Sequence, residues 1–494
     1  MGLAIDRASF SALDYQRFSL RLQDGLGLLK EVLSDPDFGG RGRSFGAELE
    51  LYIVGPDGRV RLLNEAIAAR HADPLLTLEL NRYNLEYNLA PVFGAAAPFS
   101  ALQHQLDEAL VRLGVTAAAL DARVVPVGIL PTLRRDDFGP ACMTPQPRYR
   151  ALMAGLRAIG SGRFHIAIDG TPPLRMERDD VTMEGANTSF QFHYRVRNGD
   201  YARVFNAFLL ATPIVLGVAA NSPTLFGHRL WHETRVPLFK HAIDSRVNDA
   251  AWRQPARVSF GQGWVRQSAY ELFAQTVALH PPLLPVCSDE DYRAQWRRGE
   301  APGLDELRLH QNSVWPWLRP VYDPADGGHL RIELRALPAG PSSVDMLANA
   351  AFYIGLAEGL LPVIDELLPA MPFAHAQYNF YRAAQFGLDA ALVWPQDNGR
   401  LAEVGLRGLA ARLLCTAHDG LLRIGVSAAE AGRYLAIIAA RVEGARGGAL
   451  WQLRCLDRLQ AEGLALEPAL RVMLERYITA SRSGLPVAEW PAGV

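Results

Sequence analysis

The sequence of 494 residues contains very little lysine, since Lys30 and Lys240 are the only two and every other basic position is arginine. Any cation that holds a phosphate or a carboxylate is therefore expected to be an arginine, whose planar fork suits bidentate contacts. An excess of one charge is also missing, because the formal net charge is −2 and no block of five like charges occurs. The near-neutral net charge and the lack of a charged block argue against nucleic acid as a partner.

Cysteine is scarce as well: four residues are scattered along the chain without a C-x-x-C pair. This spacing fits neither a zinc site nor a disulfide framework, and it indicates a reducing compartment. The first twenty residues mix charged and apolar side chains and lack the apolar core of a signal peptide. An apolar run near the middle of the chain, residues 207–220, is too short to span a bilayer. We therefore expect a cytoplasmic protein with no membrane partner, and homo-oligomerisation stays open.

The apolar spacing divides the chain into three regions. Residues 1–43 predict an N-terminal helical extension, and residues 44–342 alternate strand-like and helical segments in an α+β pattern. Residues 343–494 show helical spacing almost without interruption and predict a C-terminal helical region packed on the sheet of residues 44–342. The proline-rich stretches 280–285 and 315–320 predict loops.

Four of the predicted strands alternate polar and apolar residues, so that one face of each strand carries the polar side chains. A solvated sheet face is the commonest reason for such alternation. Solvated faces, however, mix lysine and threonine freely, whereas these strands offer carboxylates, amides, an imidazole and arginines, which suit a hard metal and a polyphosphate. The polar sets are Glu48 and Glu50; Asn84, Glu86 and Asn88; Ser189, Gln191, His193 and Arg195; and Arg331, Glu333 and Arg335.

The common nucleotide and nucleophile motifs are missing. The sequence has no Walker sequence, no G-x-S-x-G elbow, no H-E-x-x-H pair and no convincing G-x-G-x-x-G after a strand. The carboxylate strands are therefore the only dense concentration of chemical groups that the sequence indicates.

Six short elements, in order, resemble the glutamate–cysteine ligases of the second type and related carboxylate–amine ligases. The resemblance extends from residue 44 to about residue 470. The elements are Gly46-Ala-Glu48-Leu-Glu50, the pair Glu79 and Glu86, Ser189-Phe-Gln191-Phe-His193, Ala220-Asn221-Ser222-Pro223 with the downstream Arg235, Glu333-Leu-Arg335, and Asn379 to Ala390.

The resemblance implies a glutamine-synthetase-like fold: an antiparallel β-sheet funnel with a polar inner face, flanked by helices. It implies a ligase that uses ATP and Mg²⁺ to form an amide through an acyl phosphate, with glutamate as the default acid and an amine as second substrate. Glu50, Arg335 and Arg235 would be catalytic, and Gln191, Arg335, Asn221 and Ser222 would bind the nucleotide. The implied metal ligands are Glu48, Glu50, Glu79, Glu86, His193 and Glu333.

Two alternatives stay open at the level of the sequence. A guanidino-type phosphotransferase has a similar catalytic fold, and a non-catalytic binding or scaffold protein could retain the sheet. The segment from Thr171 to Glu184 departs from the family pattern, and insertions of this kind commonly form lids or contacts.

Overall fold

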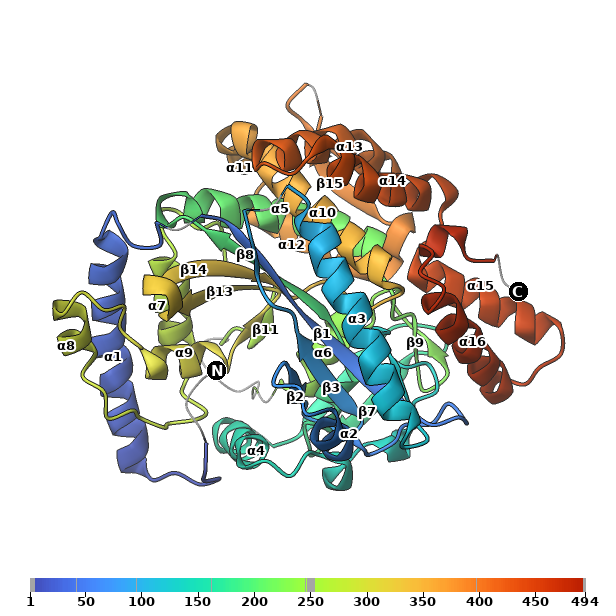
Figure 1. Cartoon of the computed structure of the whole chain (residues 1–494), viewed down its shortest axis with the longest axis horizontal. Helices are drawn as coiled ribbons and strands as arrows, with labels where there is room; N and C mark the ends of the chain where they lie inside the picture. The colour runs from blue at the N-terminus through green and yellow to red at the C-terminus, as the bar shows by residue number, and fades with distance from the viewer. Residues whose placement is uncertain are drawn as a thin grey trace.

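An antiparallel sheet of eight strands runs through the middle of the molecule (Figure 1). The structure is a computed structural model that describes residues 5–40, 42–94, 96–160, 162–244, 246, 254–396 and 398–491. Six strands follow the order β13-β14-β8-β1-β3-β2, and two short strands, β4 and β5, also pair with β1. Their bounds are β1 Ser44–Val54, β2 Leu76–Leu78, β3 Asn84–Asn88, β4 Val92–Phe93, β5 Arg123–Val125, β8 Phe190–Val196, β13 Leu318–Asp323 and β14 His329–Leu334.

Strand β1 is the longest and shows why the sheet has two different faces. Leu49, Leu51 and Ile53 are fully buried on one face, while Glu48 and Glu50 lie on the other because successive side chains point in opposite directions. The sheet curls, and helices flank it. The predicted α+β class, with an antiparallel sheet and a polar inner face, is confirmed.

The apolar face of the sheet is covered by long helices that pack on one another. Helix α10 contacts α3, α5, α13 and α14, and α12 packs on α5. Helix α10 begins at Ser343. The preceding residue, Ser342, is its N-cap, because its hydroxyl accepts a hydrogen bond from the Asp345 backbone amide. The bounds are α3 Pro98–Ala118, α5 Tyr201–Ala219, α10 Ser343–Leu360, α12 Phe373–Phe386, α13 Leu406–Arg423 and α14 Ala428–Gly444.

Two helical stretches, Asn198–Ala219 and Ser343–Ala370, are long and apolar enough to cross a membrane by length and composition. The apolar window of the first is 94% buried inside the protein, and that of the second is 78% buried. Packing within the protein core therefore accounts for the apolar character of both stretches.

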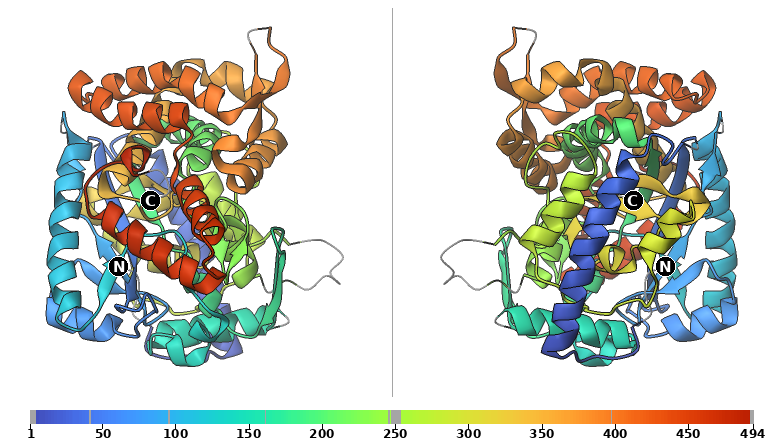
Figure 2. Two further views of the ribbon diagram at one scale, coloured as in Figure 1. Left: turned by 90° about the vertical axis from the view of Figure 1, so that its right-hand side faces the viewer. Right: turned by 90° about the vertical axis from the view of Figure 1, so that its left-hand side faces the viewer.

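The N-terminal helix α1 (Ala12–Ser34) packs against α7 (Tyr270–Leu279), α8 (Tyr292–Arg297) and α9 (Asp305–Gln311). Figure 2 shows this helix along one side of the molecule. Its apolar stripe, including Phe18, Leu22 and Leu29, is buried, so α1, which lies in the extension predicted at residues 1–43, forms a helical layer with α7, α8 and α9.

The remaining elements lie around this core. The helices are α2 Asn64–His71, α4 Pro147–Ile159, α6 Arg235–Ala242, α11 Ile364–Ala370, α15 Gly448–Ala461 and α16 Leu466–Ser481. Two-stranded sheets pair β6 (Phe164–Ile168) with β7 (Leu174–Arg178), β9 (Thr224–Leu225) with β10 (His228–Arg229), β11 (Val258–Ser259) with β12 (Trp315–Pro316), and β15 (Ala391–Pro395) with β16 (Leu401–Gly405).

Two sequence predictions differ from the structure. The stretch 315–320 forms β12 and the first half of β13 rather than a loop. Pro320 fits there because β13 is the last strand of the main sheet path, where a residue without an N–H need not break a ladder on its outer side. The C-terminal region is mostly helical, but the hairpin of β15 and β16 interrupts it.

Candidate active site

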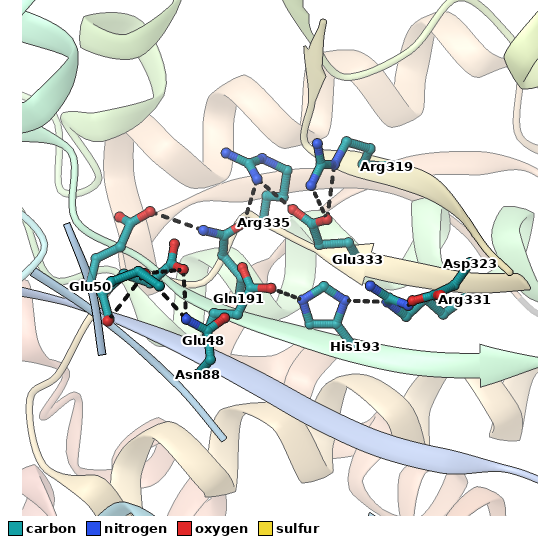
Figure 3. A network of polar contacts seen from close by, with 12 residues as sticks. Glu48, Glu50, Asn88, Gln191, His193, Arg319, Asp323, Arg331, Glu333 and Arg335 are labelled. Atoms are coloured by element: carbon teal, nitrogen blue, oxygen red, sulfur yellow. Dashed lines mark hydrogen bonds and ion pairs between the residues drawn. The ribbon is translucent and has the colours of Figure 1, made fainter. Parts of the chain in front are cut away.

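The sheet register brings together polar residues that are far apart in the sequence (Figure 3). Glu48 on β1 lies opposite Gln191 on β8, and Glu50 lies opposite Glu86 on β3. Glu333 on β14 lies opposite His193 on β8. These antiparallel pairings place the polar residues of four strands on one face, as the alternation predicts.

Glu50, Glu79 and Glu86 form the tightest group of carboxylates. One oxygen from each lies within 4.8 Å of the other two. Glu79 comes from the short connection between β2 and β3, where its side chain accepts a 3.0 Å hydrogen bond from the Leu80 amide. Glu86 accepts from the Thr77 hydroxyl at 3.1 Å and from the Asn88 amide at 2.9 Å. The three oxygens are therefore held in place, at a spacing that one hard cation could bridge.

The pKa values of these three carboxyl groups are raised in the folded protein. Burial, followed by the charge of Glu86, raises the pKa of Glu50 to about 8. Burial and the neighbouring carboxylates also raise the pKa of Glu79 well above its ordinary value, and the pKa of Glu86 shifts in the same direction. Like charges that cannot all ionise side by side raise each other's pKa in this way. A divalent cation would remove the repulsion, so the residues present fit a metal ion.

A second polar group lies beside the first, around Glu48 and His193. The Nε2 atom of His193 lies 3.0 Å from Oε1 of Glu48, and the Nε of Arg331 donates to Nδ1 of His193 at 3.1 Å. Because Nδ1 accepts this bond, a neutral His193 ring carries its proton on Nε2, the ring nitrogen on the side of Glu48. Coordination of a cation through Nε2 would therefore require this proton to move to Nδ1 and the Arg331 bond to break.

Glu333 is fully buried between two arginines. Arg319 on β13 donates to one of its oxygens through Nε at 2.9 Å and Nη2 at 2.5 Å, and Arg335 donates to the other oxygen. Burial opposes ionisation, but Arg319 and Arg335 together hold the pKa of Glu333 well below its ordinary value. A carboxylate paired in this way stays charged at any physiological pH.

Arg335 and Gln191 connect Glu333 with Glu50 (Figure 3). The Nη1 of Arg335 donates both to Glu333 and to the side-chain oxygen of Gln191. The Gln191 amide nitrogen in turn donates to Oε1 of Glu50 at 2.9 Å, and the Ser189 backbone amide donates to the other Glu50 oxygen at 2.7 Å. A continuous network therefore fixes the guanidinium of Arg335 between both sets of carboxylates.

The family model for the glutamate–cysteine ligase family 2 matches residues 44–431, which include every residue of this network. The chain belongs to the glutamate–cysteine ligase family 2. A search of curated proteins by sequence found no match.

Two solved structures are similar to this chain at low sequence identity. A glutamate–cysteine ligase from Francisella tularensis, solved with AMP, is 13% identical, with a TM-score of 0.51 over 92% of this chain and 90% of that chain. A bifunctional glutathione synthetase from Pasteurella multocida is 12% identical, with a TM-score of 0.49 over 94% of this chain and 54% of that chain. At such low identity, the first of these similarities shows the fold alone.

In this member of the glutamate–cysteine ligase family 2, Asn221, Ser222 and Arg235 lie behind the network. Asn221 and Ser222 are fully buried, and both bond to Glu233. Arg235, 2% exposed, donates to Glu233 at 3.0 Å and to the backbone oxygen of Arg335 at 3.4 Å. Most of their polar groups bond within the protein, although the buried Nε of Arg235 has no hydrogen-bond partner among the described residues. A direct contact of these three residues with nucleotide or substrate stays a prediction.

Three further residues of this family member reach the site although no role there was predicted for them. Arg319 lies in the stretch predicted as a loop, where Pro320 hides the alternation of β13. Arg331 is on a predicted polar face, but its contact with His193 depends on the sheet register. Glu184 ends the segment 171–184, which lies within the residues that the family model matches although its sequence departs from the expected pattern. Burial raises the pKa of Glu184 to about 7, while Arg335 and Arg148 oppose that shift, and its charge acts on Glu50 and Glu79.

A cavity of about 270 Å³ opens beside the Glu48 end of the network. Basic and imidazole side chains from β8 and β14 line it together with acidic residues of β1, β13 and the following turn. These lining residues are Arg195, Arg331, His193, His329, Glu48, Asp323 and Asp326. The mixture of charges suits a ligand that carries both phosphates and a metal ion.

Proposed function

We propose that this chain is an ATP-dependent ligase that joins a carboxylate to an amine, with glutamate as the default acid. The observation that carries the proposal is the network in which Gln191 and Arg335 connect Glu50, one of the three converging carboxylates, with Glu333 (Figure 3). Membership of the glutamate–cysteine ligase family 2 supports the same class of reaction. The AMP bound to the Francisella tularensis enzyme supports a nucleotide as the second ligand.

Mg²⁺ would be held by Glu50, Glu79 and Glu86, the three residues whose oxygens converge. The resemblance implies Glu48, His193 and Glu333 as further ligands. A second ion could bind there only if it displaced the arginines that contact Glu333 and His193. When bound, Mg²⁺ neutralises charge on the phosphate oxygens and orients them for transfer. Arginine 335 adds a fixed positive charge, because Glu333 and Gln191 hold its guanidinium before any ligand arrives.

The proposed reaction has two steps and needs no covalent bond to the enzyme. An oxygen of the substrate carboxylate attacks the γ-phosphorus of ATP, the bond to the bridging oxygen breaks, and ADP leaves. The amine nitrogen then attacks the acyl carbon, and the bond to the phosphate oxygen breaks as phosphate and a proton depart. The chain contributes orientation and charge neutralisation, which together can supply much of the rate enhancement of phosphoryl transfer.

The test is a screen of amino acids and amines for ADP release with Mg²⁺ and ATP, followed by mass spectrometry of the product. We expect an amide product with the wild-type chain. Replacing Glu50 with alanine should abolish ADP release because the variant loses a carboxylate of the converging group and the acceptor of the Gln191 bond. Glu177→Ala is the matched control, since Glu177 is 58% exposed on β7.

Each outcome decides between the proposal and its alternatives. Unchanged ADP release in Glu50→Ala, with all substrates present, would contradict the assigned site. A stable phosphorylated product without an amide would indicate a guanidino-type phosphotransferase. No ADP release with any amine, although nucleotide binds, would indicate a binding or scaffold protein.

A further inference from the structure

A second and larger cavity lies away from the carboxylate network. Its volume is about 840 Å³, within the range typical of small-molecule sites. Four segments enclose it: the turn after β1, residues 131–135, the turn between β9 and β10, and the first turns of α16. Figure 1 shows β9 and α16 side by side at the edge of the molecule. None of the residues that line this cavity belongs to the proposed active site.

One wall of the cavity is apolar and contains a residue in an unfavourable backbone conformation. Phe226, Leu466 and Leu470 are among the lining side chains. Phe226 occupies the turn between β9 and β10 with φ of 54°, a left-handed conformation that is rare for a bulky side chain. Strain of this kind persists only where the surrounding structure enforces it, and it is concentrated at functional sites.

The ring of Phe226 is held from two sides. Phe138 packs against it edge to face, with ring centroids 5.6 Å apart. The guanidinium carbon of Arg135 lies 5.7 Å from the centroid of the same ring, a distance that allows a cation–π interaction. The cavity therefore presents an aromatic surface and a positioned guanidinium next to each other.

Positively charged side chains outnumber negatively charged ones in the lining of the cavity. Four arginines and two acids line it, namely Arg59, Arg134, Arg135, Arg471, Asp57 and Glu467. Arg59 pairs with Asp137 at 2.7 Å, and Arg134 pairs with Glu467. Neither Arg135 nor Arg471 forms an ion pair with a carboxylate among the residues that the structure describes. A ligand complementary to this cavity would carry a negative charge for the arginines and an apolar surface for the wall that contains Phe226.

We propose that this cavity is a binding site for a small aromatic acid, whose ring packs on Phe226 and whose carboxylate pairs with Arg135. A planar carboxylate can take two parallel hydrogen bonds from a guanidinium, and a flat ring suits the apolar wall. Arg471, from α16, adds a second positive charge to the cavity. This assignment is independent of the ligase reaction, because it uses none of the residues of that site.

Isothermal calorimetry with 2-naphthoate as the probe tests the proposal on the full chain without ATP. We expect saturable binding to the wild type and binding at least about tenfold weaker for the neutral 2-naphthamide, a difference of about 1.4 kcal/mol. Arg135→Gln and Phe226→Gly should each weaken 2-naphthoate binding by about tenfold or more. Glycine accepts a positive φ at position 226, so the second variant keeps the turn.

Two controls separate this site from the proposed active site and from non-specific binding. Arg298→Gln removes an exposed arginine of the α8 region, 57% exposed, and should bind 2-naphthoate like the wild type. Glu50→Ala should also bind it normally, even if that variant has lost ADP release. Equal affinity of the wild type, Arg135→Gln and Phe226→Gly overturns the proposal, as does the absence of saturable binding up to the solubility limit. Tighter binding of naphthyl phosphate than of 2-naphthoate would overturn the carboxylate assignment.

Discussion

At the scale of single residues, the site combines carboxylates that repel one another with arginines that are already paired. Burial and the charge of neighbouring carboxylates raise the pKa of Glu50, Glu79 and Glu86, and at Glu86 the neighbouring charge is that of Glu48. Glu333, in contrast, is neutralised by Arg319 and Arg335. The first group therefore has an unmet requirement for positive charge, and the second has none.

This difference predicts that Glu79→Gln has opposite effects on stability and on cation binding. Removing one of three crowded acids should raise the unfolding temperature in EDTA, because a functional site trades stability for ligand affinity. The same change should weaken divalent cation binding by about tenfold or more, because it removes a charged carboxylate from the proposed metal site. Thermal unfolding and Mn²⁺ titration by electron paramagnetic resonance measure the two effects. Glu177→Gln should change neither, and equal Mn²⁺ affinity in all three proteins would rule out Glu79 as a ligand.

Two buried histidines give the protein a defined dependence on pH. His280 and His310 are 6% and 2% exposed. Burial, assisted by Arg257, lowers the pKa of His280 to about 3, and burial lowers that of His310 to about 4 although its contact with the Thr276 carbonyl opposes the shift. An unfolded histidine takes up a proton near pH 6.5. The unfolded state therefore binds more protons below that pH, and the free energy of unfolding falls as the pH decreases toward the folded-state values.

We expect each histidine to cost about 1 kcal/mol of stability when the pH is lowered from about 7 to about 5.5. His310→Gln should lose less stability than the wild type over this interval, as measured by urea unfolding at both pH values. The control is His104→Gln, because the side chain of His104 is 76% exposed on α3. An identical pH dependence in His310→Gln and the wild type would show that the pKa of His310 is the same in the folded and unfolded states.

At the scale of helices and strands, a buried ion pair ties α10 to α14. Arg441 on α14 donates to Asp345 on α10 at 2.7 Å, and the two side chains are 1% and 0% exposed. Arg441 also donates to Asn349, and Asp345 accepts from the Val487 amide. The pair thus connects both helices to the C-terminal segment of the chain.

Arg441→Met should destabilise the protein by about 3–5 kcal/mol, because it leaves Asp345 buried without its partner. Chemical denaturation gives the free energy of unfolding. Arg298→Met, which breaks the exposed pair with Glu300, should have little effect. A loss no larger in Arg441→Met than in Arg298→Met would show that water replaces the missing partner.

The same elements show how far the sequence could predict the structure. Strand β1 was predictable because one face is apolar and the other carries Glu48 and Glu50. Strand β13 was not, because Pro320 breaks the pattern that a central strand would have to keep. The contact of Arg319 with Glu333 was hidden for the same reason, since cross-strand partners depend on register rather than on spacing along one strand. Glu79 lies outside every alternating segment, and only the family resemblance indicated it.

At the scale of the whole molecule, the proposed ligand sites draw on elements from most of the chain. The carboxylate network joins strands β1, β3, β8, β13 and β14, which span residues 44–334. Helices from residues 343–444 cover the opposite face of the same sheet. A ligand that binds the network therefore recognises only the folded chain, and its binding free energy adds to the stability of the whole.

A non-hydrolysable ATP analogue with Mg²⁺ should accordingly raise the unfolding temperature of the wild type. At a ligand concentration of about 100 times the dissociation constant, linkage supplies about 2.7 kcal/mol. The increase should be smaller in EDTA, because the crowded carboxylates then repel the phosphates, and it should shrink in Glu50→Ala, which lacks one of the converging oxygens. Glu177→Ala should behave like the wild type. If the analogue stabilised Glu50→Ala as much as the wild type, with and without Mg²⁺, the nucleotide would have to bind elsewhere than at this network.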